Sequence, residues 1–267
     1  MIRAGKKNIS LALRAKILDI AAQTEKAHVH IGSCMSCTDI LIETLVFQMK
    51  PVDKFILSKG HASLALFVVL NYLKKISSKE LSTYFAEGTH YGIHTPSSLP
   101  KHIPLATGSL GHGLSFASGL ALGYQFLDKK NPRKVFCLMS DGECNEGAVW
   151  EAAQFASHHK LYNLTVMVDK NGLQALGRTK DVLGDGASVS KWSAFGFNTV
   201  TCNGHSYDSL TQGFKKLSRF KNKKPGMLIC KTVRGYGIRD VENKVVSNYT
   251  AVNREIADKA TARLQNL

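Results

Sequence analysis

The sequence has few acidic residues, few prolines and no long apolar run. Asp and Glu together number 20, against 35 Lys and Arg, in a chain of 267 residues. Six prolines and the lack of a low-complexity tract argue against a disordered chain. The longest apolar stretch, Leu64 to Leu70, stops at Asn71, whereas a membrane-spanning helix needs about 20 apolar residues. We therefore expect a globular protein that does not enter a membrane.

Cysteine is also scarce, and its spacing argues against a zinc site. Cys34 and Cys37 form one C-x-x-C pair, and no second pair completes a four-ligand set. The pair runs into an apolar helical pattern, which favours buried free thiols in a reducing compartment. The basic start, residues 1–22, lacks the serine richness of a transit peptide and is expected to form the first helix. These features predict a cytoplasmic protein.

Basic residues give the chain a formal net charge of +15 and gather at residues 129–134 and 215–224. A solvated basic surface explains them most simply, and attraction of anionic substrates or of an acidic partner chain is the functional alternative. No zinc-finger spacing, RNA-binding aromatic strand or long basic arm accompanies them, so we expect no binding of nucleic acid.

Alternation of apolar runs with helical patterns predicts a three-layer αβα fold with a mainly parallel sheet, in a single domain over residues 1–267. Strands are expected at residues 55–57, 135–139, 164–168, 197–201 and 227–231. Helices are expected at about residues 11–24, 38–49, 63–73, 108–123, 147–159 and 206–220. Ser10 is the expected cap of the first helix, and Ser36 or Thr38 is expected to open the second. Residues 83–104 read as a long loop, which is often functional.

Two polar segments follow predicted parallel strands directly. Asp141-Gly142 follows the strand at 135–139, and Asn171 comes 30 positions later, after the strand at 164–168. Either dipeptide alone, Asp-Gly or Asn-Gly, is ordinary turn chemistry. Together they are placed on the same carboxyl edge of the sheet, where α/β folds bind ligands.

This edge suits a hard divalent cation bound to a diphosphate. Mg²⁺ prefers about six oxygen ligands, and the Asp141 carboxylate, the Asn171 amide oxygen and the Leu173 carbonyl could supply three. Gly142 permits close approach of the backbone to phosphate, and a helix beginning near Gly147 could direct its positive end toward the anion. Ca²⁺ or Mn²⁺ could take the place of Mg²⁺.

The sequence resembles the thiamine-diphosphate-binding part of the transketolase family over about residues 10–245. The motifs that carry the resemblance are KAHVHIG at residues 26–32, SKGHAS at 58–63, TGSLGHG at 107–113 and DGECNEG at 141–147, followed by Asn171. The TGSLGHG loop and the metal motif are highly specific in combination.

The resemblance implies a role for particular residues. It implies that Asp141, Asn171 and the Leu173 carbonyl bind the metal and that His30, His61 and His94 reach the donor sugar. The cofactor contacts that it implies are made by His61, Gly108, Leu110, Asp141, Gly142, Glu146 and Asn171.

Three positions depart from the family pattern. Ser140 stands where the metal motif has its first Gly, and His94 lies in a Gly-Ile-His-Thr-Pro segment where the family usually has Gly-His-Pro. A late histidine, common in the family after a Gly-x-Gly such as Gly235-Tyr236-Gly237, is absent here. The small hydroxyl of Ser140 should be tolerated, whereas the missing histidine argues against assuming the family's usual substrates.

The family's second domain, with the glutamate that activates the cofactor, has no counterpart in these residues. The resemblance therefore implies a separately encoded C-terminal subunit, an α₂β₂ assembly, and transfer of a two-carbon ketol unit between sugar phosphates. Three alternatives stay open: the α-chain of a 2-oxoacid dehydrogenase or decarboxylase, a non-catalytic cofactor-binding module, and an NAD-dependent oxidoreductase. The last lacks a G-x-G-x-x-G after its first strand.

Overall fold

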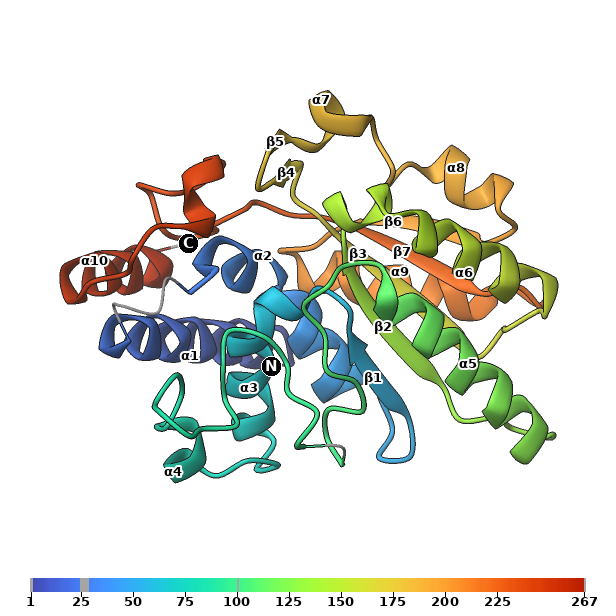
Figure 1. The fold of residues 1–267 in the computed structure, drawn as a ribbon, viewed down its shortest axis with the longest axis horizontal. Helices are drawn as coiled ribbons and strands as arrows, with labels where there is room; N and C mark the ends of the chain where they lie inside the picture. The colour runs from blue at the N-terminus through green and yellow to red at the C-terminus, as the bar shows by residue number, and fades with distance from the viewer. Residues whose placement is uncertain (1, 25–28, 100, 267) are drawn as a thin grey trace.

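The computed structural model describes residues 2–24, 29–99 and 101–266, and its centre is a five-stranded parallel β-sheet (Figure 1). The strands pair in the order β1-β2-β3-β7-β6, and each neighbouring pair is parallel. Their bounds are β1 Lys54–Leu57, β2 Val135–Ser140, β3 Leu164–Lys170, β7 Gly226–Lys231 and β6 Asn198–Asn203. The five strands predicted from apolar runs are all present.

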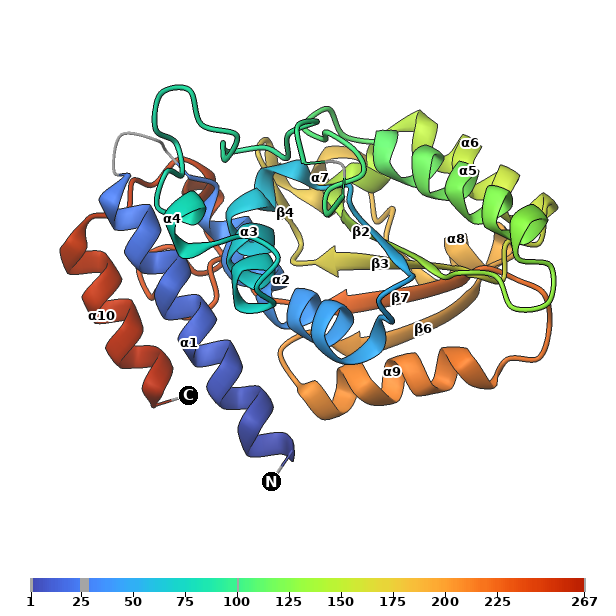
Figure 2. The same cartoon turned by 90° about the horizontal axis from the view of Figure 1, so that it is seen from below.

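Helices cover both faces of the sheet, which makes the three predicted layers (Figure 2). One face carries α1 Ile2–Gln23, α2 Ile31–Ile42, α3 Ser63–Tyr72 and α9 Tyr207–Arg219, and the other carries α5 His112–Leu127 and α6 Gly147–His158. Because strand side chains alternate between faces, Phe136 and Leu138 of β2 pack with the first group while Cys137 and Met139 pack with the second. A sheet covered on both sides needs apolar residues at every position, which explains the continuous apolar run of β2.

Shorter elements surround this core. They are a π-helical turn Glu43–Gln48, α4 Ser78–Leu81, the hairpin β4 Leu173–Gln174 and β5 Gly177–Arg178, α7 Thr179–Leu183, α8 Val189–Ala194 and α10 Arg254–Gln265, with single 3₁₀ turns at Gly60–Ala62, Gly142–Asn145 and Val245–Asn248. The predicted loop at 83–104 is irregular over its described residues, apart from a bridge between Thr95 and Thr107. No helix in the described part of the chain is long and apolar enough to span a membrane.

Two predicted helix starts are wrong because the hydroxyl groups concerned have partners elsewhere. Ser10 lies inside α1, where its Oγ donates to Asp39 Oδ1 of α2 at 2.6 Å. Ser36 and Thr38 lie inside α2: the Ser36 hydroxyl donates to Asp169 of β3 at 2.5 Å, and the Thr38 hydroxyl donates to the Cys34 carbonyl, as threonine often does within helices.

The helix α5 begins later than the predicted Gly108. Gly111 has a φ of +91°, a left-handed conformation that ends the preceding loop, and the helix begins one residue later. The cysteine prediction is confirmed, because Cys34 and Cys37 are buried and free within α2. No sequence pattern indicated α10, which packs against α1 (Figure 1).

Candidate cofactor and metal site

Two of the three predicted metal ligands, Asp141 and Asn171, lie at the same edge of the sheet, where β2 and β3 end side by side. The Asp141 carboxylate accepts a hydrogen bond from the backbone amide of Gly172 at 2.7 Å and from that of Gly142 at 3.0 Å. Gly172 is the residue after Asn171, so the turn that follows β3 wraps around the carboxylate that follows β2. The juxtaposition expected from two parallel strands is therefore present.

The predicted metal ligands at this edge all present oxygen atoms. Asn171 Oδ1 accepts from the amide of Leu173 at 3.0 Å, and the Leu173 carbonyl accepts from Arg234 Nη1 at 2.6 Å. A carbonyl has two lone pairs, so that of Leu173 keeps one for a metal ion. A set made of carboxylate, amide and carbonyl oxygens suits a hard divalent cation rather than zinc or copper.

Asp141 carries an electrostatic penalty that a cation would relieve. The residue is 1% exposed. Burial, and then the nearby charge of Asp169, raise the pKa of its carboxyl from 3.8 to about 6, against the hydrogen bonds from Gly172 and Gly142. A bound divalent cation would favour the ionised form, so the residues present fit a metal site.

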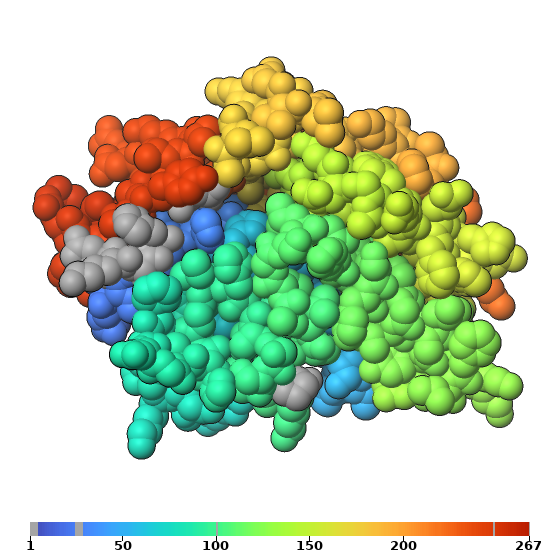
Figure 3. All heavy atoms as spheres, in the orientation of Figure 1, coloured from blue at the N-terminus to red at the C-terminus, as the bar shows by residue number. Residues whose placement is uncertain are grey.

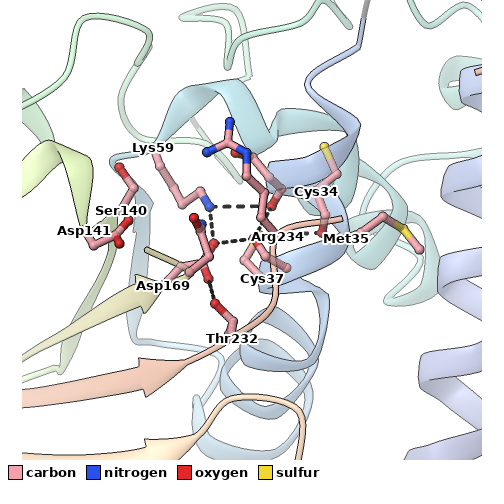
Figure 4. Close-up of polar contacts among 12 residues, drawn as sticks. Cys34, Met35, Cys37, Lys59, Ser140, Asp141, Asp169, Thr232 and Arg234 are labelled. Atoms are coloured by element: carbon pink, nitrogen blue, oxygen red, sulfur yellow. Dashed lines mark hydrogen bonds and ion pairs between the residues drawn. The ribbon is translucent and has the colours of Figure 1, made fainter. Parts of the chain in front are cut away.

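A buried ion pair stands behind this carboxylate (Figure 4). Lys59 Nζ pairs with Asp169, and both side chains are 0% exposed. Asp169 also accepts from Ser36 Oγ at 2.5 Å and from the hydroxyl of Thr232. The ends of β1, β3 and β7 and the helix α2 thus share one carboxylate.

Arg234 is a residue of this site that sequence reasoning did not predict. It is buried, and its Nε donates to Ser247 Oγ at 2.9 Å while Nη1 holds the Leu173 carbonyl. Burial lowers the pKa of its guanidinium, against the charges of Asp169 and Asp141. Its position shortly after an apolar parallel strand is the same signal that identified Asp141.

The edge also fits the diphosphate predicted beside the metal. Lys59 and Arg234 supply two buried positive charges (Figure 4). Gln174 Nε2 is buried without a hydrogen-bond partner among the described residues, and a Cβ at Gly142 would lie 2.9 Å from the oxygen of the same side chain. A phosphate oxygen could accept from the spare donor of Gln174 where glycine leaves room.

Three predicted histidines meet beside this edge. The ring of His30 lies 5.6 Å from that of His61 and 6.0 Å from that of His94, measured between centroids. His30 is the residue before α2, His61 lies in the turn after β1, and His94 belongs to the long loop. Burial, and then the charge of Lys59, hold the pKa of His61 well below its usual range, and burial lowers the pKa of His94. Both rings are therefore suited to act as neutral donors or acceptors.

The predicted loop at residues 107–113 is fixed against the ends of β1 and β2. Thr107 Oγ1 donates to the Leu57 carbonyl at 2.7 Å, and the amide of Gly111 donates to the buried Glu143 at 2.9 Å. A Cβ on Gly108 would lie 3.3 Å from the His94 ring, so the loop and this histidine are in contact. Leu110 is half-buried in the same loop.

Glu146 differs from the other predicted cofactor residues because it is exposed, at the N-cap of α6.

In the surface view, the residues that surround the site enclose a hollow with blue N-terminal atoms at its base (Figure 3). The motif residues 26–28, including His28, lie outside the described residues.

Comparison with known proteins agrees with this geometry. Residues 7–263 match the family described as "Transketolase, thiamine diphosphate binding domain". One subunit of the apulose-4-phosphate transketolase of Phocaeicola vulgatus is 33% identical over 86% of this chain and 83% of its own length. Transketolase-like protein 2 of Homo sapiens is 36% identical over 92% of this chain but only 40% of its own length.

A solved transketolase from Leishmania mexicana has the same fold, with a TM-score of 0.85 at 21% identity over 97% of this chain and 41% of that one. The chain thus spans about two fifths of the length of its longer relatives. The description of the matching family names thiamine diphosphate, which is the predicted cofactor. This chain belongs to the transketolase family, in which it corresponds to the thiamine-diphosphate-binding domain.

Proposed function

We propose that this chain is one subunit of a split transketolase that transfers a two-carbon ketol unit from a ketose, normally phosphorylated, to an aldose. The observation that carries the proposal is the meeting of Asp141 with the turn at Asn171–Gly172, beside three clustered histidines. A relative of similar length is itself named as one subunit of a transketolase, which supports the split arrangement.

The residues of the site divide into three tasks. Asp141, Asn171 and the Leu173 carbonyl would hold the metal ion, and the metal would hold the diphosphate in turn. The cofactor contacts would be His61, Gly108, Leu110, Gly142 and Glu146, with Asp141 and Asn171 acting through the metal. When bound, thiamine diphosphate supplies the electron sink for the carbanion.

His30, His61 and His94 would bind the donor sugar and move protons at its hydroxyl groups. The rings of His61 and His94 lie 5.6 Å and 6.0 Å from that of His30, so the three can contact neighbouring oxygens of one small substrate. Since the pKa of His61 is held well below its usual range, this ring would accept a proton only transiently.

A separate C-terminal subunit would complete the site in an α₂β₂ assembly. Glu146, exposed at the start of α6, is the residue through which this chain would contact the cofactor-activating glutamate of that subunit. Residues 1–267 would then form one cofactor-binding domain, and the six free cysteines agree with a cytoplasmic location.

The test is an assay of ketol transfer from xylulose 5-phosphate by this chain alone and by this chain with its co-purified partner. We expect turnover only from the mixture. Substantial transfer by the single chain would contradict the split arrangement. Turnover of pyruvate in place of the ketose would instead favour a 2-oxoacid dehydrogenase or decarboxylase.

A further inference from the structure

His205 lies outside the site but holds the segment that carries two of its residues. Its side chain, 9% exposed, places Nδ1 3.0 Å from Asp39 Oδ2, while Nε2 accepts from the backbone amide of Val233 at 2.9 Å. An amide can only donate, so Nε2 is unprotonated and the ring proton resides on Nδ1, directed at the carboxylate. The ring therefore links α2 to the end of β7: Nδ1 donates to Asp39 and Nε2 accepts from Val233.

The backbone hydrogen bonds that join the β7 segment to β3 end just before Val233. The amide of Thr232 still donates to Lys170 of β3 at 3.0 Å, but the next amide donates to the His205 ring instead. On one side of Val233, the hydroxyl of Thr232 reaches Asp169 (Figure 4), and on the other side Arg234 reaches the Leu173 carbonyl. The bond to His205 thus sits between two contacts with the metal edge.

The surroundings of His205 keep this bridge in one orientation. Asp39 also accepts from Arg14, Ser10 and Tyr207, and the His205 ring stacks on Tyr236 at 3.9 Å with an interplanar angle of 14°. The charged and titratable groups that face the ring are thus the carboxylate of Asp39, the guanidinium of Arg14 and the two tyrosines.

We propose that His205 is a positioning residue for the cofactor site, which it orders by accepting the Val233 amide and so fixing Thr232 and Arg234. Loss of that acceptor would leave the Val233 amide unpaired, and the segment would move to satisfy it. Any shift of Arg234 displaces the Leu173 carbonyl, one of the proposed metal ligands. The inference rests on the proposed function, because it assigns the effect to the binding of metal and diphosphate.

Two substitutions separate the two nitrogen positions of the ring. In His205→Gln the side-chain amide can take the place of Nε2 and accept from Val233, whereas in His205→Asn it can take only the place of Nδ1. His159→Asn, at an exposed position, is the matched control. The full chain would be titrated with thiamine diphosphate in the presence of Mg²⁺, and amide hydrogen exchange of residues 231–236 would be measured in parallel.

We expect His205→Asn to weaken binding by about 10-fold, the lower end of the range for residues that support metal ligands, and to speed exchange at residues 231–236. His205→Gln should restore both toward the unsubstituted chain. Equal behaviour of the two variants, or unchanged binding in His205→Asn, would overturn the inference. If the unsubstituted chain bound no thiamine diphosphate while the exchange difference persisted, the proposed function would fail, and the role of His205 at the cofactor site with it.

Discussion

Asp141 is the residue whose environment says most about the site. Its carboxylate is buried beside a second carboxylate, Asp169, and both features raise its pKa to about 6. A carboxylate with a raised pKa binds a proton readily when no metal cation is present. Metal and proton therefore compete for the same oxygens near neutral pH.

We predict that the affinity of the chain for Mg²⁺ rises with pH up to about 6 and then levels off. Below the pKa the carboxyl is protonated and the metal must displace the proton, so affinity should fall by about tenfold per pH unit. Calorimetric titration between about pH 5 and 8 would measure this, with Asp141→Asn expected to abolish binding and the exposed Asp181→Asn as control. An affinity that stays constant down to about pH 4.5 would contradict the assignment.

Arg234 should contribute more to the binding of the diphosphate than to the binding of the metal ion. Arg234→Gln removes the contact that holds the Leu173 carbonyl and also a positive charge beside the proposed diphosphate, so it should weaken the binding of thiamine diphosphate with Mg²⁺ more than that of Mg²⁺ alone. Separate titrations with each ligand would measure the two effects, and the exposed Arg239→Gln should change neither. A loss of affinity for both ligands in equal measure would favour a purely structural role.

The residues that sequence could predict are those whose neighbours are fixed by the sheet. Asp141 and Asn171 follow apolar strands, and parallel pairing alone brings them together. Arg234 follows a strand as well, but its bond to Leu173 depends on a turn that no pattern describes. His205 reads from the sequence as a structural or surface residue, because no pattern connects it to Val233.

At the level of elements, Asp169 is the main junction near the site. It receives Lys59 from the end of β1, Ser36 from α2 and Thr232 from the end of β7. Each partner comes from a different layer or strand, so the carboxylate holds the edge together. Removing one member of such a buried ion pair destabilises the fold, because the other charge stays buried without a partner.

Lys59→Met should destabilise the fold by about 3–5 kcal/mol, because it leaves the charge of Asp169 buried and unpaired. The double variant Lys59→Met with Asp169→Leu should recover a large part of that loss. Urea denaturation of the three proteins would measure the differences. A double variant less stable than the single one would show that the charges themselves are not the cause.

Two glycines of α5 offer a matched comparison. A Cβ at Gly113 would overlap the side chain of Ser58, whereas a Cβ at Gly119 would have no atom within 4 Å. Gly113→Ala should therefore cost about 1–3 kcal/mol and disturb the contact of Ser58 with Glu143, while Gly119→Ala should gain about 0.5–1 kcal/mol. Thermal unfolding would measure both, and equal effects would mean that the close approach at Gly113 is unimportant.

The sequence predicted helices and strands where their apolar residues follow a regular pattern. It did not predict the residues at which the helices begin. The strands β2, β3 and β7 follow from continuous apolar runs. The starts of α1 and α2 did not follow from capping residues, because Ser10 and Ser36 bond to side chains of other elements. The weakly apolar α10 and the short hairpin β4–β5 have no clear pattern in the sequence.

For the whole molecule, one edge of the sheet gathers most of the residues assigned to the cofactor. The strand order places β2 and β3 side by side. The start of α2, the turn after β1 and the long loop before α5 bring His30, His61 and His94 to the same edge. The chain spans about two fifths of its longer relatives, and in the proposed assembly the remaining contacts of the cofactor come from the second subunit. Binding of the diphosphate and metal, however, should depend mainly on the residues present here.

The most direct test is therefore a titration of this chain with thiamine diphosphate, followed by tryptophan fluorescence, in Mg²⁺ and again in excess EDTA. We predict saturable binding with Mg²⁺, its loss in EDTA, and no binding by Asp141→Asn under either condition. Binding that survives EDTA, or that is unchanged in Asp141→Asn, would contradict the claim that these two strand ends hold the cofactor through a metal ion.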